Sequence, residues 1–301
     1  MTARARYHHT DFWGLLVRRW YRLSQPPKLR HMARTLPYLK LKPAGDAWDV
    51  YWKGRKVTRT APWSELKAGA PERLYVIGSG PSIREQYIDR LAGEACVLLN
   101  GAIALTLDGT LGRPFAVMVE DARFILEKGD MLKRLPRGTR LCLVGSALRA
   151  LGEVDPELFS HFRLYFIQGF ETPYGRPRRS LEAVDPRHFR QSGRAKLSLN
   201  MEEGHFGCGT VMYCGIQLAF YLRVRALFLV GFDMTNFEQP RFYESERNAA
   251  WTGLVKAYHG RVLPAMELAA HTARDVGMTI ENCSHTSAIP RTLFPFNDRL
   301  M

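Results

Sequence analysis

From residue 73 onward, short apolar runs alternate regularly with amphipathic or apolar stretches of helical length. The runs that predict buried strands are 73–78, 95–100, 115–121, 140–146, 163–168, 226–234 and 278–284. The stretches that predict helices are 82–91, 122–135, 210–222 and 263–277. Alternation at this spacing is typical of a mostly parallel sheet covered by helices. We therefore predict a doubly wound, Rossmann-type α/β domain that binds its ligand at the carboxyl ends of the strands.

Residues 1–70 follow a different pattern and predict an extension of the main domain, which we place at 71–301. Asp11 is a candidate cap for a helix that mixes aromatic, apolar and basic residues: Phe12, Trp13, Leu15, Leu16, Trp20 and Tyr21 with Arg18, Arg19 and Arg22. Further on, 47–57 alternates like a β-hairpin with a turn at Lys53-Gly54. Two interpretations stay open. The aromatic side chains either pack on the main domain or form a peripheral membrane contact.

Charge is concentrated in this extension. The chain has 43 Lys and Arg against 29 Asp and Glu, a formal net charge of +14. The first 60 residues hold 14 of the basic residues and 3 of the acidic ones, so they carry most of that excess. A basic stretch of this kind favours nucleic acid, an anionic membrane face or an acidic polymer. Because the α/β body shows no nucleic-acid-binding motif, we expect no nucleic-acid partner.

Cysteine usage and hydropathy suggest a cytoplasmic location. The five cysteines form no CxxC motif and lie mostly in apolar runs, as expected for buried reduced thiols. No apolar run reaches the roughly 18 residues of a membrane span. The short apolar core "FWGLLV" does not suffice for a signal peptide. We therefore expect a cytoplasmic protein that lies peripherally on the inner face of the cell membrane.

The first predicted strand runs into the loop Gly78-Ser79-Gly80-Pro81-Ser82. After a strand, such a loop brings backbone N–H groups close to an anion at the start of the next helix. Pro81 suits the first helical turn, where its missing N–H costs nothing. A purely structural tight turn is the alternative. The loop therefore predicts a phosphate-binding site without deciding which phosphate.

Three common phosphate-binding motifs do not match. A Walker loop requires a lysine that is absent here, and a dinucleotide fold requires an acid about 20 residues on, to hold the ribose. The second strand instead ends at the neutral Asn100, which also disfavours a methyltransferase. An amide can donate a hydrogen bond to a phosphate that a carboxylate would repel. A phosphotransferase similar to the pterin pyrophosphokinases stays open as the alternative function.

In the order of its motifs the chain resembles the bacterial sialyltransferases of glycosyltransferase family 42 and the related lipopolysaccharide-core Kdo transferases. The resemblance spans about 74–285 and rests on the GSGPS loop, a second strand that ends in Asn, the "ALFLVGFD" strand and a histidine before a helix. It implies a GT-A-like nucleotide-binding domain that takes a CMP-sugar and requires no metal or other cofactor.

The resemblance assigns donor-binding roles residue by residue. Beside the glycine loop, in which Ser79 stands where the family has Asn, it implies that Asn100 binds the donor phosphate. Glu120 falls near a second Asn of the family and departs from the pattern. Thr210 falls near a Thr-Ser pair that contacts the sugar carboxylate, and Asp233 matches the end of the family's Gly-Ile-Asp motif. Structural alternatives stay open: Asp233 as an anchor of its turn, and Glu120 with its neighbour as a metal ligand.

The resemblance also implies two catalytic residues. His259 matches the family's catalytic histidine, and Tyr243 matches a lid tyrosine that donates to the phosphate; we place the lid at about 234–259. A histidine with a near-neutral pKa suits removal of the acceptor's proton, while hydroxyl groups and cations stabilise the leaving phosphate. The expected reaction is a direct, inverting, metal-independent displacement. Alternatively, His259 is a surface residue and Tyr243 only packs in the lid.

A basic stretch at 170–200 bears on the acceptor. We expect it to form a long loop, and its cations are Arg176, Arg178, Arg179, Arg187, Arg190, Arg194 and Lys196. Guanidinium groups pair well with phosphates, so these side chains and the basic extension favour an anionic, lipid-linked acceptor such as inner-core lipopolysaccharide. A merely solvated loop is the alternative. A homo-oligomer is compatible with the sequence.

Overall fold

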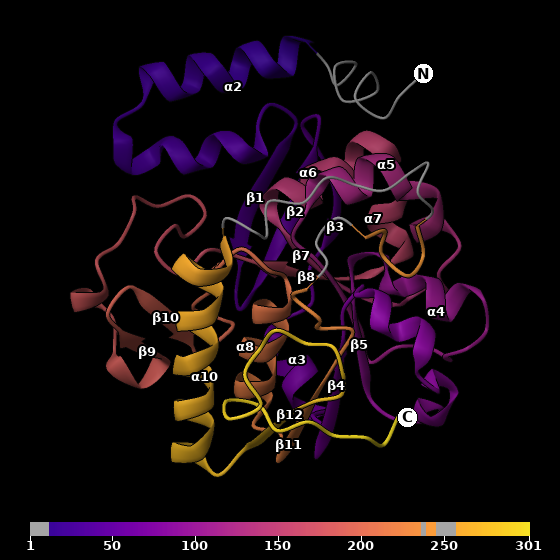
Figure 1. The fold of residues 1–301 in the computed structure, drawn as a ribbon. Coiled ribbons are helices and arrows are strands. Elements are labelled where there is room, and N and C mark those ends of the chain that lie inside the picture. The colour runs from indigo at the N-terminus through magenta and orange to yellow at the C-terminus, as the bar shows by residue number, and fades with distance from the viewer. Residues whose placement is uncertain (1–11, 236–238, 245–256) are drawn as a thin grey trace.

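The computed structural model describes residues 12–235, 239–244 and 257–301. At its centre is a seven-stranded sheet in the order β12-β11-β4-β5-β6-β7-β8 (Figure 1). Its strands are β4 (Arg73–Ile77), β5 (Cys96–Leu99), β6 (Ala116–Val119), β7 (Arg140–Val144), β8 (Arg163–Ile167), β11 (Ala226–Val230) and β12 (Thr279–Asn282). All neighbouring strands in this sheet are parallel. The predicted doubly wound α/β fold is confirmed.

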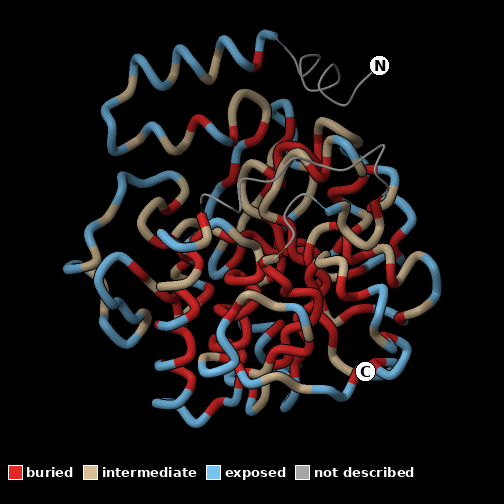
Figure 2. The backbone as a smooth tube through the Cα atoms, in the orientation of Figure 1, coloured by how far each residue is buried: buried red, intermediate tan, exposed pale blue. Residues whose placement is uncertain are grey.

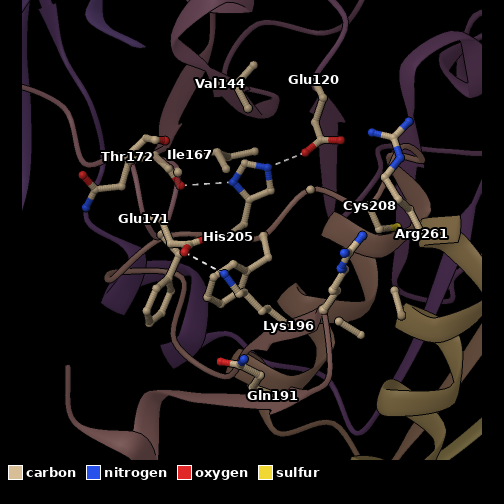
Figure 3. A pocket seen from close by; sticks show the side chains of 18 of the residues that line it. Glu120, Val144, Ile167, Glu171, Thr172, Gln191, Lys196, His205, Cys208 and Arg261 are labelled. Atoms are coloured by element: carbon tan, nitrogen blue, oxygen red, sulfur yellow. Dashed lines mark hydrogen bonds and ion pairs between the residues drawn. The ribbon is translucent and has the colours of Figure 1, made fainter. Parts of the chain in front are cut away.

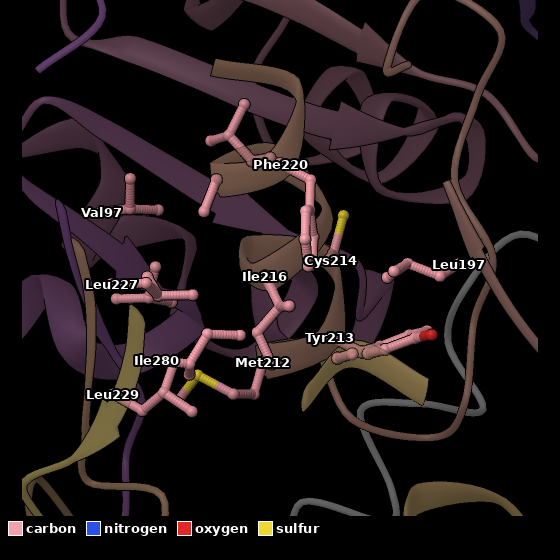
Figure 4. Close-up of a cluster of buried hydrophobic side chains, with 14 of the residues drawn as sticks. Val97, Leu197, Met212, Tyr213, Cys214, Ile216, Phe220, Leu227, Leu229 and Ile280 are labelled. Carbon is pink, nitrogen blue, oxygen red and sulfur yellow. The ribbon is translucent and has the colours of Figure 1, made fainter. Parts of the chain in front are cut away.

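Helices cover both faces of the sheet. One face carries α3 (Trp63–Ala68), α8 (Met212–Leu222) and α10 (Leu263–Val276), and the other carries α4 (Ala104–Leu107), α5 (Ala122–Lys133), α6 (Gly145–Val154) and α7 (Leu158–His161). Every residue of α8 is buried, because the helix lies between the sheet and α10. Figure 4 shows its side chains among residues of β5, β11 and β12. The apolar run at 210–222 is thus explained by burial on all sides.

The order of the strands places the ligand site. From β4 the chain adds strands in one direction as far as β8, and then returns to place β11 on the other side of β4. The loops that follow β4 and β11 therefore leave the sheet in opposite directions and open a crevice between them. The GSGPS loop follows β4, and the segment Gly231-Phe232-Asp233 follows β11. The two motifs that the sequence singled out thus meet at the switch point of the sheet.

The helix predicted at 82–91 is wrong. Two short 3-10 turns, η2 (Pro81–Glu85) and η3 (Ile88–Leu91), flank the extended residue Gln86, with φ −115° and ψ 144°. The reason is that the backbone of this segment bonds to distant residues. The N–H of Ser82 donates to Asp233, and that of Tyr87 donates to the carbonyl of Leu300. These bonds replace the i to i−4 ladder of an α-helix.

The basic stretch at 170–200 is not a simple loop. It contains η5 (Leu181–Ala183), η6 (Pro186–His188) and an antiparallel hairpin of β9 (Phe189–Ser192) and β10 (Ala195–Ser198). The turn contains Gly193 at φ +55°, in the left-handed region that favours glycine. The hairpin packs against α8 and α10. The expectation of a long loop fails because Ala195, Leu197 and Ser198 of β10 are buried, the first two in the hydrophobic core beside α8.

The N-terminal segment divides into a packed part and an exposed part. The strands β1 (Leu39–Ala44), β2 (Ala47–Trp52) and β3 (Arg55–Arg59) form an antiparallel sheet. The ring of Trp48 lies 5.6 Å from that of Phe166, and Trp52 packs on α7, so this sheet shares the core of the main domain. By contrast, most residues of α2 (Phe12–Ser24) are exposed or half-buried in Figure 2, and its aromatic side chains Phe12, Trp13 and Trp20 are exposed. The 3-10 helix η1 (Pro27–Thr35) connects α2 to β1.

Candidate functional site

A cavity of about 530 Å³, which we call the loop pocket, lies in the crevice at the switch point. It brings together most of the predicted donor-binding residues, from five different segments of the chain: Gly78, Ser79, Gly80, Pro81, Asn100, Glu120, Thr210 and Asp233. Ser82 alone among that set does not line it. Residues up to 155 positions apart in the sequence thus line the same cavity, as expected of a ligand site at a switch point.

Hydrogen bonds join the glycine loop to the turn after β11. The N–H of Gly80 donates to the carbonyl of Gly231 at 3.0 Å. Ser82 donates twice to the buried carboxylate of Asp233, from its N–H at 2.9 Å and from Oγ at 2.5 Å. Ser82 therefore lies behind the pocket, with both of its donors in use. The contacts of Asp233 are those of an anchor for the loop, the structural alternative raised from the sequence.

Gly80 is constrained by this junction. A Cβ at that position would lie 2.5 Å from Oδ2 of Asp233 and 2.7 Å from the carbonyl oxygen of Gly231. Neither atom can give way without breaking the bonds that close the loop. The second glycine of the motif is thus required for the close approach of two backbone turns.

Asn100 occupies the wall formed by the end of β5. Its backbone is left-handed, with φ +48°, which Asn tolerates better than most residues. Its side-chain oxygen Oδ1 is buried and has no hydrogen-bond partner among the described residues. Native proteins rarely leave a buried amide unsatisfied. An unpaired carbonyl oxygen at the wall of a cavity is prepared to accept a hydrogen bond from a ligand, and the NH₂ group of the same amide can donate one.

Residues 239–244 lie across the glycine loop. Arg84 donates to three backbone carbonyls of this segment, including that of Glu244 at 2.9 Å, and the N–H of Phe242 donates to the carbonyl of Ser79 at 3.3 Å. The ring of Tyr243 lies directly on Gly101, where a Cβ would overlap it. Hydrogen bonds with Arg84 and Ser79 thus hold this part of the predicted lid in place. Residues 236–238 and 245–256 of the predicted lid lie outside the described residues.

Arg241 is the cation that this segment brings to the loop pocket. It lines the cavity, and its Nη1 lies 3.1 Å from the hydroxyl oxygen of Tyr243. Burial raises the pKa of Tyr243 above its ordinary value, although Arg241 opposes that shift. Tyr243 therefore stays a hydrogen-bond donor throughout the physiological range, but its side chain does not line the cavity.

The two remaining predictions for this region differ in outcome. Thr210 lines the loop pocket just ahead of α8, where its hydroxyl accepts the N–H of Met212 at 3.3 Å. His259 is exposed within the π-helical turn η8 (Tyr258–Val262) and lines neither cavity described in this section. The side chain from that turn that reaches the site is Arg261, which sequence reasoning did not single out.

A second and larger cavity, about 1360 Å³, adjoins the first; we call it the basic cavity. It lies between η1, the β9–β10 hairpin and α10, and Figure 3 looks into it. Its cations are Arg34, Arg178, Arg190, Arg194, Lys196 and Arg261. Lys196 is paired with Glu171 at 2.7 Å, whereas the guanidinium groups of Arg178, Arg194 and Arg261 make no hydrogen bond or ion pair within the described chain. Cations without an internal partner are available to an anionic ligand.

Glu120 and Arg261 line both cavities and mark where they meet. Glu120 follows β6, and its Oε1 lies 2.5 Å from Nε2 of His205, while Nδ1 of His205 lies 3.0 Å from the carbonyl of Gln168 (Figure 3). Because a carbonyl only accepts, Nδ1 carries a proton. Sequence reasoning missed this pair, since 85 positions separate the two residues and no local motif links them.

The same carboxylate belongs to a group of side chains of the types that can ligate a metal. Glu120, His205 and Cys214 offer ligand atoms within 4.8 Å of one another. Two atoms bound to one zinc ion lie roughly 3.3 Å apart, because each metal–ligand bond is about 2 Å long. The 2.5 Å between Glu120 and His205 is instead that of a direct hydrogen bond. Burial also raises the pKa of Cys214 well above its ordinary value, which keeps the thiol protonated.

Glu120→Gln should lower the pKa of His205. Burial is the largest single influence and lowers the pKa of His205, but the charge of Glu120, the hydrogen bond to Glu120 and the bond to the Gln168 carbonyl together raise that pKa above its ordinary value. The pair therefore stabilises the fold at low pH, and this contribution disappears as the pH rises through the raised pKa. An NMR titration of the His205 ring in both proteins would measure the shift. An unchanged pKa would show that Glu120 does not set the charge of the ring.

No protein-family model matches the chain. Its sequence is 22% identical over 240 residues to a probable 3-deoxy-manno-octulosonic acid transferase of Salmonella typhimurium, which covers 75% of this chain and 86% of the relative. The predicted resemblance to the Kdo transferases is confirmed.

No described helix has the length and apolar character to cross a membrane.

Solved structures with a similar fold are two sialyltransferases of Campylobacter jejuni. CstII, solved in complex with a substrate analogue, cytidine-5'-monophosphate, has a TM-score of 0.43 and 10% identity and covers 76% of this chain and 86% of its own. The monofunctional α-2,3-sialyltransferase Cst-I has a TM-score of 0.40 and 15% identity and covers 75% and 80%. These values describe a distant likeness.

Proposed function

We propose that this chain is a CMP-sugar-dependent glycosyltransferase that transfers Kdo, or a related ulosonate, to an anionic glycan acceptor. The observation that carries the proposal is that residues matched to a CMP-sugar motif, far apart in sequence, line the one loop pocket. The similarity to a probable Kdo transferase, over most of both chains, supports the choice of sugar.

The donor would bind in the loop pocket. The amide nitrogen of Asn100 can donate to a phosphate in this cavity, and positive charge comes from Arg261 and from Arg241, which is also paired with Glu244 at 3.4 Å. When the bond between the sugar and the phosphate breaks, charge develops on the leaving phosphate, and fixed donors and cations lower the energy of that state. Because guanidinium groups supply this charge, the proposed reaction requires no metal ion. Transfer in the presence of EDTA tests this point.

The acceptor would bind in the basic cavity. Its arginines suit a phosphorylated saccharide, and it meets the loop pocket at Glu120 and Arg261. An acceptor hydroxyl held at that junction would face the anomeric carbon of a donor in the loop pocket. Attack from the side opposite to the leaving phosphate gives an inverting displacement in one step.

A thermal-shift screen tests the choice of nucleotide. CMP should raise the melting temperature, because a ligand that binds only the folded state stabilises it. UDP, S-adenosylmethionine and ATP with magnesium serve as controls, the last because it tests the pterin pyrophosphokinase-like alternative. Release of CMP from CMP-Kdo or CMP-sialic acid would then identify the sugar. Stabilisation by ATP and magnesium alone would contradict the proposal.

Helix α2 would hold the enzyme on an anionic membrane surface. Phe12, Leu16, Trp20 and Leu23 repeat at helical spacing on one face and are 75%, 44%, 66% and 75% exposed. Arginines flank this face, as expected of a helix that lies in a membrane interface. In co-sedimentation with vesicles of phosphatidylglycerol and phosphatidylethanolamine, Trp20→Ser should lower the bound fraction several-fold. Equal binding by Trp20→Ser and by the wild type would exclude this face as the contact.

A further inference from the structure

The pair of Glu120 and His205 is built in a way that donor binding alone does not explain. Glu120 stands at the junction of the loop pocket and the basic cavity, and 22% of its side chain is exposed there. An isolated carboxylate at this place would repel a donor that carries a phosphate and a carboxylate of its own. The ring of His205, whose pKa the carboxylate raises, lies against Oε1 and offsets part of that charge.

Both nitrogens of His205 are engaged. Nδ1 donates to the carbonyl of Gln168, and Nε2 lies against Glu120. The ring is therefore unavailable to a substrate, and what it does is hold one oxygen of the carboxylate. The other oxygen, Oε2, is turned away from the ring in Figure 3, and the buried thiol of Cys214 also donates a hydrogen bond to the carboxylate. His205 thus occupies Oε1, and Oε2 is the basic atom of the pair that lies away from the ring, on a residue that lines both cavities.

We infer that Glu120 is the catalytic base that removes the proton from the acceptor hydroxyl, and that His205 is a positioning residue that fixes the carboxylate. This inference rests on the proposed glycosyl transfer. It differs from the prediction for His259, whose side chain is exposed and lines neither cavity. It also explains why Glu120 carries a carboxylate at a position where the resemblance predicts an Asn.

The step balances in atoms and charge. The acceptor oxygen forms a bond to the anomeric carbon while its proton passes to Oε2 of Glu120. The bond between that carbon and the phosphate oxygen breaks, and its electron pair leaves with CMP. Glu120 ends protonated, and His205 keeps both of its protons. Exchange with solvent through the basic cavity returns the carboxylate for the next turnover.

The test measures transfer from CMP-Kdo to a phosphorylated inner-core oligosaccharide, with full-length protein. In Glu120→Ala, kcat should fall by about 100- to 10,000-fold, the usual contribution of general base catalysis, while KM for the donor changes little. Sodium formate should restore part of the rate, because a small carboxylate can enter the space that the side chain leaves. His205→Gln should lower kcat less and should not respond to formate.

Controls separate this inference from the proposed function. Glu127→Gln removes an exposed carboxylate on α5 that lines neither cavity, and it should keep kcat within a few-fold. Glu120→Gln repeats the test without a change of shape, in case the alanine variant does not fold. If Glu120→Gln transfers at the wild-type rate while His259→Ala does not, the inference is overturned. If the wild type neither binds CMP nor consumes any CMP-sugar, the proposed function itself is wrong.

Discussion

Asp233→Ala should lower the free energy of unfolding by about 3 kcal/mol and abolish CMP binding. The carboxylate is buried and accepts two hydrogen bonds from Ser82, and its loss leaves a buried N–H without a partner. The glycine loop would then keep only backbone bonds, such as that from Gly80 to Gly231, to the end of β11 and the turn after it. Urea denaturation measures the stability, and calorimetric titration with CMP measures the binding.

The matched control is Ser82→Ala, which removes only the hydroxyl bond and keeps the bond from the backbone. It should cost about 1 kcal/mol and leave CMP affinity within a few-fold, because Ser82 lies behind the pocket. A double-mutant cycle between the two positions isolates their interaction. Should Asp233→Ala bind CMP normally, the carboxylate does not position the loop.

Asn100→Asp should weaken CMP binding by about 100-fold without a loss of stability. A carboxylate in contact with a phosphate at about 4 Å costs several kcal/mol in a partly buried cavity, and part of that cost is relieved by solvent and by the nearby arginines. Asp tolerates the left-handed backbone of Asn100 as Asn does, so the fold has no reason to change. Calorimetric titration and a thermal melt check the two halves of this prediction.

Asn100→Gly gives the matched control, since glycine keeps the backbone conformation and removes only the amide. It should lose about 10-fold in affinity, as expected for one hydrogen bond to a charged group. The difference between the two variants measures the repulsion by the new charge. Equal affinities would indicate that no phosphate lies near Asn100.

The sequence predicted the parallel sheet and the loop pocket well, for a physical reason. Buried parallel strands are nearly continuous apolar runs, and ligand-binding side chains collect directly after them. Gly78, Asn100 and Asp233 could therefore be found from their positions relative to such runs. Their assembly at one crevice followed from a single rule of chain topology.

Other features depend on contacts that the sequence does not display. The turns at Pro81–Glu85 and Ile88–Leu91 replace a helix because distant residues take up their backbone N–H groups. The Glu120–His205 pair and the basic cavity arise from segments that no motif connects. His259 was assigned a catalytic role from its place before a helix, but the exposure of its side chain depends on how that turn packs. Local patterns predict elements, whereas these features need tertiary structure.

The bond between Ser82 and Asp233 has a consequence for how this protein is made. It joins residues 151 positions apart, and β11, which carries one half of the crevice, also completes the sheet beside β4. A growing chain that has reached only β8 has the glycine loop but not the strand that anchors it. Contacts of such long range form late and slow the search for the native topology. A nucleotide can therefore stabilise the folding chain only at a late stage, after β11, in the last third of the chain, has been synthesised.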